Sequence, residues 1–252
     1  MDFTNTTVLV TGASRGIGKA TARFFAQAGA QVAVHYHNDY DAARHTLTSL
    51  PGVGHATFQA DISNPGDASM LVDSVVRTMG KIDVLINNAG IYMRHDLLCA
   101  SYEQWQQSWI RTVGVNLLGA ANVTFCAAQY MIRQGGGRII NISSRGAFRG
   151  EPDAPAYGAS KAGLNAMSQS MAQALAPHKV FVFVLAPGWV ETDMALPHLS
   201  GPEGNAIRNQ SPLGRVAQPE EMARIILFLA SPGSDYMTGC IIDANGASYL
   251  RS

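Results

Sequence analysis

The sequence predicts an α/β protein built on a doubly wound, mostly parallel sheet of about seven strands, with helices on both faces. Short runs rich in β-branched residues alternate with longer helical patterns from one end of the chain to the other. Most of these short runs are continuously apolar, as expected for strands that are buried on both faces. The chain has 252 residues, of which 47% are hydrophobic, so we expect a single domain over residues 1–252.

Seven runs are candidate strands, and their order along the chain sets the order of the motifs discussed below. They cover residues 7–11, 31–36, 56–60, 84–87, 138–143, 180–185 and 240–243.

The segment between the first two candidate strands has the periodicity of an amphipathic helix. Its apolar and small residues recur at helical spacing: Ile17, Ala20, Thr21, Phe24, Phe25 and Ala28. Gly29 follows as a C-cap. A second helix is expected to begin at Asn64-Pro65, a capping residue followed by proline. Other helical patterns cover residues 102–133, 157–176 and 219–230.

One long segment, residues 193–218, has no clear periodicity and is rich in Pro, Gly, Asn and Ser. A loop of this length in a compact domain is usually functional or mobile. We therefore expect it to act as a substrate loop or lid.

Charge and apolar patterning exclude several classes of protein. Lysine plus arginine number 18 and aspartate plus glutamate also number 18, so no net positive field would attract nucleic acid or an anionic membrane. The strongest apolar runs are far shorter than the roughly 20 residues that span a bilayer. The N-terminus lacks the features of a signal peptide, so we expect a cytoplasmic protein. Cys99, Cys126 and Cys240 have no C-x-x-C spacing and are expected to be buried free thiols.

A glycine-rich turn joins the first candidate strand to the amphipathic helix. It reads Gly12-Ala13-Ser14-Arg15-Gly16-Ile17-Gly18. Glycines allow a tight turn in which backbone N–H groups approach a pyrophosphate, and the helix N-terminus adds roughly half a positive charge. The Lys-Ser/Thr pair of a P-loop is missing, which disfavours ATP or GTP hydrolysis. A purely structural turn is the alternative, but the position between strand and helix favours a dinucleotide site.

The end of the second candidate strand favours NADP(H), with NAD(H) as the alternative. NAD-binding folds usually place Asp or Glu there, where the carboxylate accepts hydrogen bonds from the ribose 2′-hydroxyl. This strand ends in Tyr36-His37-Asn38, and no carboxylate occurs before Asp39. These three residues and Arg15 can meet a 2′-phosphate, unless they are merely solvated.

Three further segments place polar residues at strand ends and at a helix start. They are Asn87-Asn88-Ala89-Gly90 after the fourth strand, Ser143-Ser144 after the fifth, and Tyr157-Gly158-Ala159-Ser160-Lys161 at the next helix. Ligands of open α/β sheets bind at the carboxyl ends of the strands, so these segments can converge on one crevice.

Tyr157 and Lys161 share one helix face because they are four residues apart. A free tyrosine has a pKa near 10, too high for ready proton exchange at neutral pH. A cation about 4 Å away is worth roughly 4 kcal/mol at an effective dielectric constant near 20, or about 3 pKa units downward. Desolvation acts in the opposite direction, while an oxidised nicotinamide ring helps. We therefore expect a pKa for Tyr157 that is low enough for acid–base chemistry.

With these motifs in this order, the chain resembles the short-chain dehydrogenase/reductase family over essentially its whole length. The motifs that carry the resemblance are Thr11-Gly12-x-x-x-Gly16-x-Gly18, Asn87-Asn88-Ala89-Gly90, Ser144, Tyr157-x-x-x-Lys161 and Pro187-Gly188. The resemblance implies a Rossmann-type fold, hydride transfer between a nicotinamide cofactor and a carbonyl or secondary alcohol, and a homo-oligomer, as tetramer or dimer.

The resemblance also implies roles for individual residues. Tyr157 would give a proton to the reacting oxygen or take it away, Ser144 would hold that oxygen, and Lys161 would also bind the nicotinamide ribose. Asn116 matches a fourth catalytic position, which connects Lys161 to solvent. The implied cofactor contacts are Gly12, Ser14, Arg15, Gly16, Ile17, Gly18, Tyr36, His37, Asn38, Asp61, Ile62, Asn88, Ala89, Gly90, Tyr157, Lys161, Pro187, Gly188, Val190 and Thr192.

The substrate is constrained least. Within the family the chain looks closest to 3-oxoacyl-(acyl-carrier-protein) reductases, but reductases of sugars, polyols and other small ketones share these motifs. The basic residues expected to dock a carrier protein are only partly visible, at Arg133 and near His178. The expected pocket walls are residues 193–218 with Met93, Arg94, His95, Arg145, Phe148 and Trp189.

Other classes fit the sequence less well. A non-catalytic, cofactor-binding regulator would commonly lack the tyrosine or the lysine, and both are present here. No Gly-x-Ser-x-Gly elbow accompanies Ser144, which disfavours a hydrolase. His35 and His37 lack nearby cysteine or acidic partners, so we expect no metal site.

Overall fold

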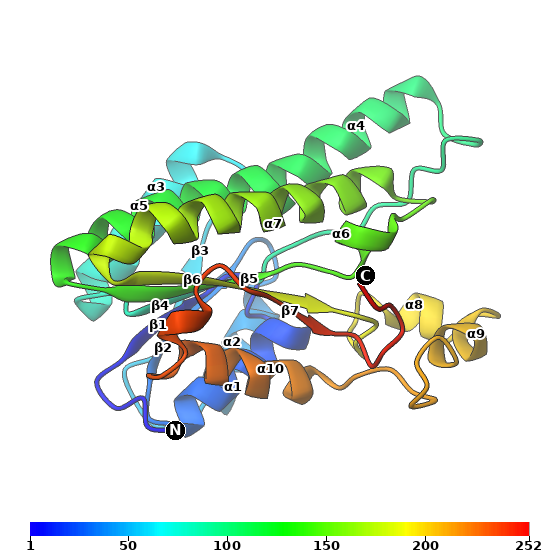
Figure 1. The fold of residues 1–252 in the computed structure, drawn as a ribbon. Coiled ribbons are helices and arrows are strands. Elements are labelled where there is room, and N and C mark those ends of the chain that lie inside the picture. The colour runs from blue at the N-terminus through cyan, green and yellow to red at the C-terminus, as the bar shows by residue number, and fades with distance from the viewer. Residues whose placement is uncertain (252) are drawn as a thin grey trace.

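Seven parallel strands form the centre of the computed structural model, which describes residues 1–251 (Figure 1). They are β1 (Thr7–Val10), β2 (Gln31–Tyr36), β3 (Ala56–Gln59), β4 (Val84–Asn87), β5 (Gly137–Ile142), β6 (Val180–Pro187) and β7 (Ile241–Ala244). The order across the sheet is β3-β2-β1-β4-β5-β6-β7, with all neighbours parallel. The expected doubly wound sheet is confirmed, and the direction of winding reverses between β1 and β4.

Helices cover both faces of this sheet (Figure 1). One face carries α1 (Gly16–Gln27), α2 (Tyr40–Ser49) and α10 (Pro219–Ala230). The other face carries α3 (Pro65–Met79), α5 (Ala120–Gln134) and α7 (Pro155–Leu175). The remaining helices are α4 (Tyr102–Val113), the π-helix η1 (Gly114–Gly119), α6 (Gly146–Arg149), η2 (Ala176–His178), α8 (Leu196–Leu199), α9 (Gly204–Arg208) and η3 (Asp235–Met237).

The helix ends follow from local capping chemistry. The side chain of Asn64 accepts hydrogen bonds from the N–H groups of Gly66 and Asp67, and Pro65 occupies the first turn of α3 as expected. Helix α2 was not expected, because it buries only Ala43 and Thr46 and therefore has little apolar periodicity. Helices α8 and α9 lie in the segment 193–218, which the sequence predicts as irregular.

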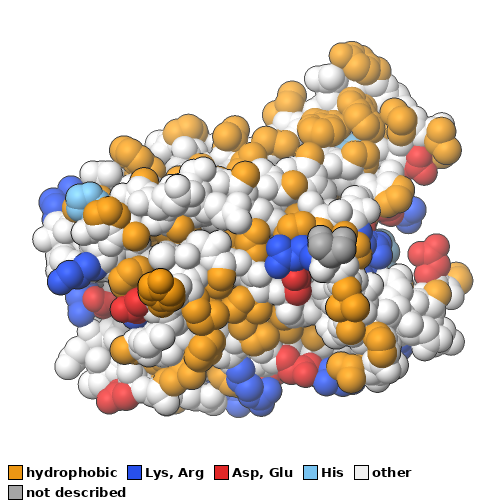
Figure 2. Space-filling view, in the orientation of Figure 1, with side chains coloured by type: hydrophobic (Ala, Val, Ile, Leu, Met, Phe, Trp, Pro, Cys, Tyr) orange, Lys and Arg blue, Asp and Glu red, His pale blue; other side chains and the backbone are white. Residues whose placement is uncertain are grey.

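The longest helix runs without a break through α4, η1 and α5, over Tyr102–Gln134. It has 33 residues and contains an 18-residue window with a mean hydropathy of 1.2, so it could cross a membrane by length and composition alone. However, α5 buries Val123, Ala127 and Met131 against the sheet, as a core helix does. Apolar side chains are also exposed along this helix, and Figure 2 shows them gathered over α4.

The three cysteines are free, but their expected burial is wrong in part. Cys99 is exposed, and Cys126 and Cys240 are half-buried. Cys99 lies in the turn before α4, outside both sheet-facing clusters of apolar side chains.

The central strands are the most sensitive part of this fold. We expect Leu85→Ala in β4 to lower the free energy of unfolding by about 2–5 kcal/mol, because the buried side chain leaves a cavity. Leu97→Ala is the matched control, with a side chain that is 70% exposed, and should change the free energy by less than about 0.5 kcal/mol. Urea titrations of both variants measure the difference, and equal effects would contradict the assignment of the core.

Candidate active site

The glycine-rich turn after β1 packs directly against the segment after β4. Gly12 has a φ of +62°, and a Cβ atom there would lie 2.9 Å from the Cα of Ala89. A Cβ atom on Gly18 would lie 2.3 Å from the carbonyl oxygen of Gly12. Space therefore requires glycine at both positions, and at Gly12 the backbone conformation does as well.

Thr11 and Asn88 join these two segments by hydrogen bonds. The side-chain amide of Asn88 donates to the carbonyl oxygens of Thr11 and Gly12, in both cases at 3.0 Å. The hydroxyl of Thr11 accepts from the backbone N–H groups of Asn88 and Ala89, also at 3.0 Å. The amide of Asn88 is thus engaged in holding the turn.

A buried histidine supports the turn from the neighbouring strand. Nδ1 of His35 accepts from the N–H of Gly12 at 3.0 Å, and Nε2 donates to the carbonyl oxygen of Ala60 at 3.2 Å. Burial lowers the pKa of His35 to about 4, so the ring is neutral at physiological pH. Sequence reasoning weighed His35 only as a metal ligand and missed this role. A histidine within an apolar strand beside a glycine turn is the signal that could have found it.

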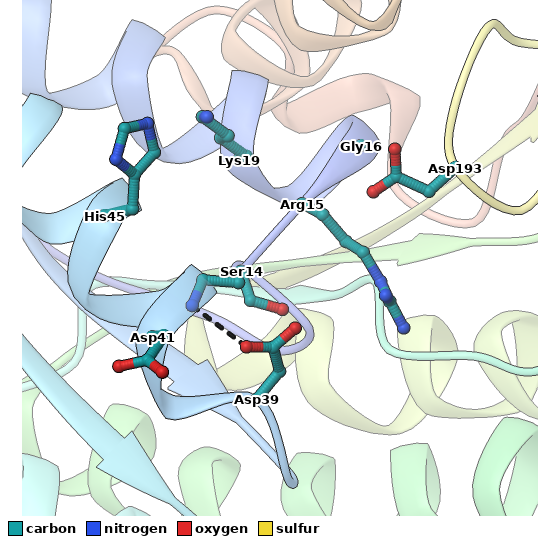
Figure 3. Close-up of a pocket in the computed structure, with 9 residues that line it drawn as sticks. Ser14, Arg15, Gly16, Lys19, Asp39, Asp41, His45 and Asp193 are labelled. Carbon is teal, nitrogen blue, oxygen red and sulfur yellow. Dashed lines mark hydrogen bonds between the residues drawn. The ribbon is translucent and has the colours of Figure 1, made fainter.

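A cavity of about 440 Å³ lies beside the turn, where α1 and α2 begin (Figure 3). It is lined by Ser14, Arg15, Gly16, Lys19, Asp39, Asp41, Ala42, His45 and Asp193. The first three were expected as cofactor contacts, whereas the α2 residues were missed because α2 itself was not expected. The carboxylate of Asp39 accepts from the N–H of Ala42 at 3.0 Å and thereby caps α2 (Figure 3).

The expected contacts near the ends of β2 and β3 also lie close together. Tyr36 is buried, while His37 is exposed and its Nε2 lies 3.6 Å from the Oδ2 of Asp61. Asn38 is exposed beside His37. Ile62 is buried, and its Cγ1 would lie 2.9 Å from a Cβ atom on Gly119.

Tyr157 and Lys161 lie together in the first half of α7, where Lys161 is buried and Tyr157 is half-buried. Nζ of Lys161 is 5.8 Å from the centre of the Tyr157 ring and donates to the carbonyl oxygen of Ile142 at 2.8 Å. The hydroxyl of Ser144 accepts from the N–H of Gly146 at 3.0 Å, and hydrogen bonding with Ser144 lowers the pKa of Tyr157. The strand β5, which ends at Ile142, therefore presents its last residues to α7.

Burial dominates the acid–base properties of this pair. It raises the pKa of Tyr157 to about 12, against the smaller, lowering effect of Ser144, and the carboxylate of Glu151 raises it further. Burial also lowers the pKa of Lys161 to about 8. The structure does not show the expected lowering of the Tyr157 pKa by Lys161, because desolvation outweighs the hydrogen bond with Ser144 and the Lys161 ammonium donates to a backbone carbonyl. At neutral pH, Tyr157 holds its proton and Lys161 is charged.

Asn116 ties the segment after β4 to α7. Its Oδ1 accepts from the N–H of Ile91 at 2.8 Å, and its Nδ2 donates to the carbonyl oxygen of Ile91 at 3.0 Å and to the hydroxyl of Ser160 at 3.2 Å. A Cβ atom on Gly90 would lie 3.3 Å from the Asn116 Oδ1 and 3.5 Å from the Lys161 Nζ. Gly90, Asn116 and Lys161 are thus neighbours, as expected. Asn116 lies in the π-helix η1, a feature that the sequence pattern did not indicate.

The segment after β6 reaches the glycine-rich turn. Pro187 ends β6, and the N–H of Gly188 donates to the carbonyl oxygen of Ala244 at 3.1 Å. Val190 is buried and forms a parallel bridge with Ala217. Thr192 lies close to the turn, because its Cγ2 would be 3.1 Å from a Cβ atom on Gly16.

Aromatic rings continue from Tyr157 toward the segment 193–218. The ring of Tyr92 contacts that of Tyr157 edge-on at 5.0 Å between centres, and His198 of α8 contacts Tyr92 at 5.9 Å. Trp189 lies 5.5 Å from His198. Tyr92 and His198 were missed by sequence reasoning, although Tyr92 follows Gly90 of the Asn-Asn-Ala-Gly motif by two positions.

Several expected pocket walls have other partners. Nε of Arg94 pairs with the carboxylate of Asp153 at 3.0 Å, and His95 is buried with its Nε2 accepting from the N–H of Ala156 at 3.2 Å. The guanidinium of Arg251 lies 4.4 Å from the centre of the Phe148 ring. Arg145 is buried and donates to Gln210 and Ser248. The charge of Arg94 is thus paired within the protein, whereas Arg145 donates to uncharged groups.

Comparison with known proteins identifies relatives over nearly the whole chain. Residues 12–246 match the family model described as enoyl-(acyl carrier protein) reductase. A 3-oxoacyl-(acyl-carrier-protein) reductase of Thermotoga maritima is 39% identical over 240 residues, covering 94% of this chain and 95% of that protein. An L-rhamnose 1-dehydrogenase (NAD(P)(+)) of a Sphingomonas species is 37% identical, covering 97% and 96%. The crystal structure of a short-chain type dehydrogenase/reductase from Mycobacterium marinum superimposes with a TM-score of 0.90 at 33% identity, covering 99% and 98%.

The neutral state of His35 predicts an acid-sensitive fold. The unfolded chain takes up a proton near pH 6.5, whereas folded His35 does so only near pH 4, so stability falls as pH decreases through that interval. The expected loss is roughly 3 kcal/mol in the free energy of unfolding. Urea titrations between these pH values measure it. His35→Gln should lose this part of the pH dependence, and the exposed His178→Gln should keep it; if His35→Gln responds like the wild type, the assignment fails.

Proposed function

This chain belongs to the short-chain dehydrogenase/reductase family of oxidoreductases, and on that premise we propose that it interconverts a carbonyl and a secondary alcohol with NADP(H), using Tyr157 as the acid–base group. The observation that carries the proposal is the placement of the half-buried Tyr157 and the buried Lys161 beside Ser144, at the carboxyl edge of the sheet where the glycine-rich turn lies. That edge is where open α/β sheets bind their ligands.

In the proposed reduction, Tyr157 gives its proton to the carbonyl oxygen of the substrate. Its raised pKa keeps the proton on the phenol at neutral pH until charge develops on that oxygen. Ser144 donates a hydrogen bond to the same oxygen and stabilises the developing charge. Lys161, charged below a pKa of about 8, lies near enough to stabilise the tyrosinate that forms. The bound nicotinamide supplies the hydride.

The cofactor preference for NADP(H) rests on the cavity beside the turn. Arg15, Lys19 and His45 line it, and α1 and α2 begin there, so it lies at the positive ends of two helix dipoles. The first carboxylate after β2, Asp39, is occupied as the cap of α2. Asp41 and Asp193 also line the cavity, so a ribose 2′-phosphate would meet the basic side chains of Arg15 and Lys19 and the two helix N-termini against these two carboxylates.

The two candidate substrate classes are 3-oxoacyl groups and small ketones or sugars. Similarity to the 3-oxoacyl-(acyl-carrier-protein) reductase of Thermotoga maritima favours a 3-oxoacyl substrate for this chain. Similarity to the L-rhamnose 1-dehydrogenase of the Sphingomonas species favours a sugar. Arg133 and His178, expected as docking residues for a carrier protein, lie near the edge where β5 and β6 begin, opposite the edge that carries Tyr157. The aromatic wall of Tyr92, His198 and Trp189 favours a small free ketone or sugar as the second candidate. Initial rates of NADPH consumption with 3-oxoacyl thioesters, ketones and sugars separate the classes.

We propose further that the protein is a cytoplasmic homo-oligomer with a small-molecule substrate. Ile110, Leu118 and Phe125 are more than half exposed along the α4–α5 helix, and burying them against a second copy would remove apolar surface from water. The segment 193–218, which carries His198, is proposed as the substrate lid.

The acid–base role predicts the behaviour of Tyr157→Phe. This change removes only the hydroxyl, so we expect kcat to fall by about a hundredfold to ten-thousandfold while the Kd for NADPH stays largely unchanged. Tyr102→Phe, at an exposed tyrosine, is the matched control and should keep its kcat. Turnover near the wild-type level in Tyr157→Phe would refute the role.

The cofactor preference predicts a Kd for NADPH at least about tenfold lower than for NADH, a difference of about 1.4 kcal/mol. Arg15→Ala should weaken NADPH binding more than NADH binding, because only NADPH carries the extra phosphate. Arg23→Ala, an exposed position on the same helix, should leave the ratio unchanged. Fluorescence titration of both cofactors measures the ratio, and tighter NADH binding by the wild type would overturn the preference.

A further inference from the structure

Arg145 holds a buried positive charge whose partners are uncharged. Arg145 is 3% exposed. None of the ion pairs formed within residues 1–251 includes it. Its terminal nitrogens donate to the hydroxyl of Ser248 and the amide oxygen of Gln210. Burial lowers the pKa of Arg145 to about 10, so the group is still charged at neutral pH. The carboxylate of Glu151 acts on Arg145 from beyond ion-pair distance and pairs with Arg149 instead. A buried cation with no counter-ion in direct contact is unfavourable.

A cavity of about 190 Å³ opens beside this guanidinium. Polar groups of Gln210, Ser211 and Ser248 line it together with apolar side chains that include Ile207 and Leu213. Its walls are held in place, since the hydroxyl of Ser211 donates to the carbonyl oxygen of Gly246 at 2.6 Å.

The charge of this cavity is positive overall. Arg215 and Glu221 also line it, but they form an ion pair at 2.7 Å and cancel each other. Arg145 therefore remains as the net charge.

The cavity adjoins the proposed substrate site, because Trp189 and residues 207–217 of the proposed lid contribute to its lining, but it does not contain the proposed acid–base groups. Within residues 1–251, the side chains that line it exclude Ser144, Tyr157 and Lys161. The Arg145 side chain instead faces the segment that follows α9 and the C-terminal segment.

We propose that this cavity binds a small carboxylate with a short apolar tail, with Arg145 as the counter-ion. A guanidinium has five N–H donors in a planar fork that matches a carboxylate, and Gln210 and Ser248 account for two of the donors. The volume is below the range of about 300–1,000 Å³ that is usual for ligand pockets, so only an acid of a few carbon atoms fits. The apolar walls receive its tail. This site does not depend on the proposed reaction.

The test uses butyrate as the probe and its uncharged isostere butyramide as the control ligand. Calorimetric titration and thermal unfolding of the whole protein measure binding at neutral pH, with sodium chloride at equal ionic strength as reference. Gln210→Glu places a carboxylate against Arg145 without changing the shape of the side chain. Gln169→Glu introduces the same charge at an exposed position on α7.

We expect butyrate, but not butyramide, to bind the wild type and to raise its Tm. Gln210→Glu should be at least as stable as the wild type and should bind butyrate at least about tenfold more weakly, whereas Gln169→Glu should bind it as the wild type does. The proposal is overturned if the wild type ignores butyrate, if butyramide binds equally well, or if Gln210→Glu is clearly destabilised or keeps the full affinity.

Discussion

The hydrogen bonds between the segments after β1 and β4 are the interaction on which the rest of the site depends. The side chains of Thr11 and Asn88 take part in four such bonds, which join residues 11–12 to residues 88–89 where the winding of the sheet reverses. Helices leave the sheet toward opposite faces there, and a crevice opens between them. The four bonds bridge that crevice at its floor and hold Gly12 against Ala89. Every group proposed to contact the cofactor is positioned relative to this junction.

The pair of Tyr157 and Lys161 on α7 shows how one environment acts on two groups in opposite directions. Desolvation disfavours charge, so it raises the pKa of Tyr157 and lowers that of Lys161. Both shifts leave a neutral phenol beside a cation at neutral pH. A phenol in this state is suited to giving up a proton only when negative charge forms next to it. The surrounding protein therefore favours proton donation over a standing tyrosinate.

Most of the fold could be predicted from the sequence because its signals are local. The seven strands are continuous apolar runs, and α3 and α10 carry capping residues at their starts. Helix α2 could not be predicted from periodicity, since it buries little. Within the site, the family resemblance implied that Asn116 acts next to Lys161, and the structure places Gly90, Asn116 and Lys161 together. The partners of Arg145 and His35 lie 65 and 23 residues away or more, and only the folded chain reveals contacts of that kind.

The π-helix between α4 and α5 has a consequence for how this chain can vary. Each residue of an α-helix adds a rotation of about 100°. Inserting or deleting one residue in the rod before α5 would therefore turn the apolar stripe of α5 away from the sheet, unless a wider helical turn absorbed the change. The wide turn at Gly114–Gly119 is such a place, and Asn116 sits in it. It lets the two halves of one continuous rod keep separate angular settings, one for the crevice and one for the sheet. A one-residue change in length is therefore tolerable at this wide turn and in the loops around the rod, but not within α5.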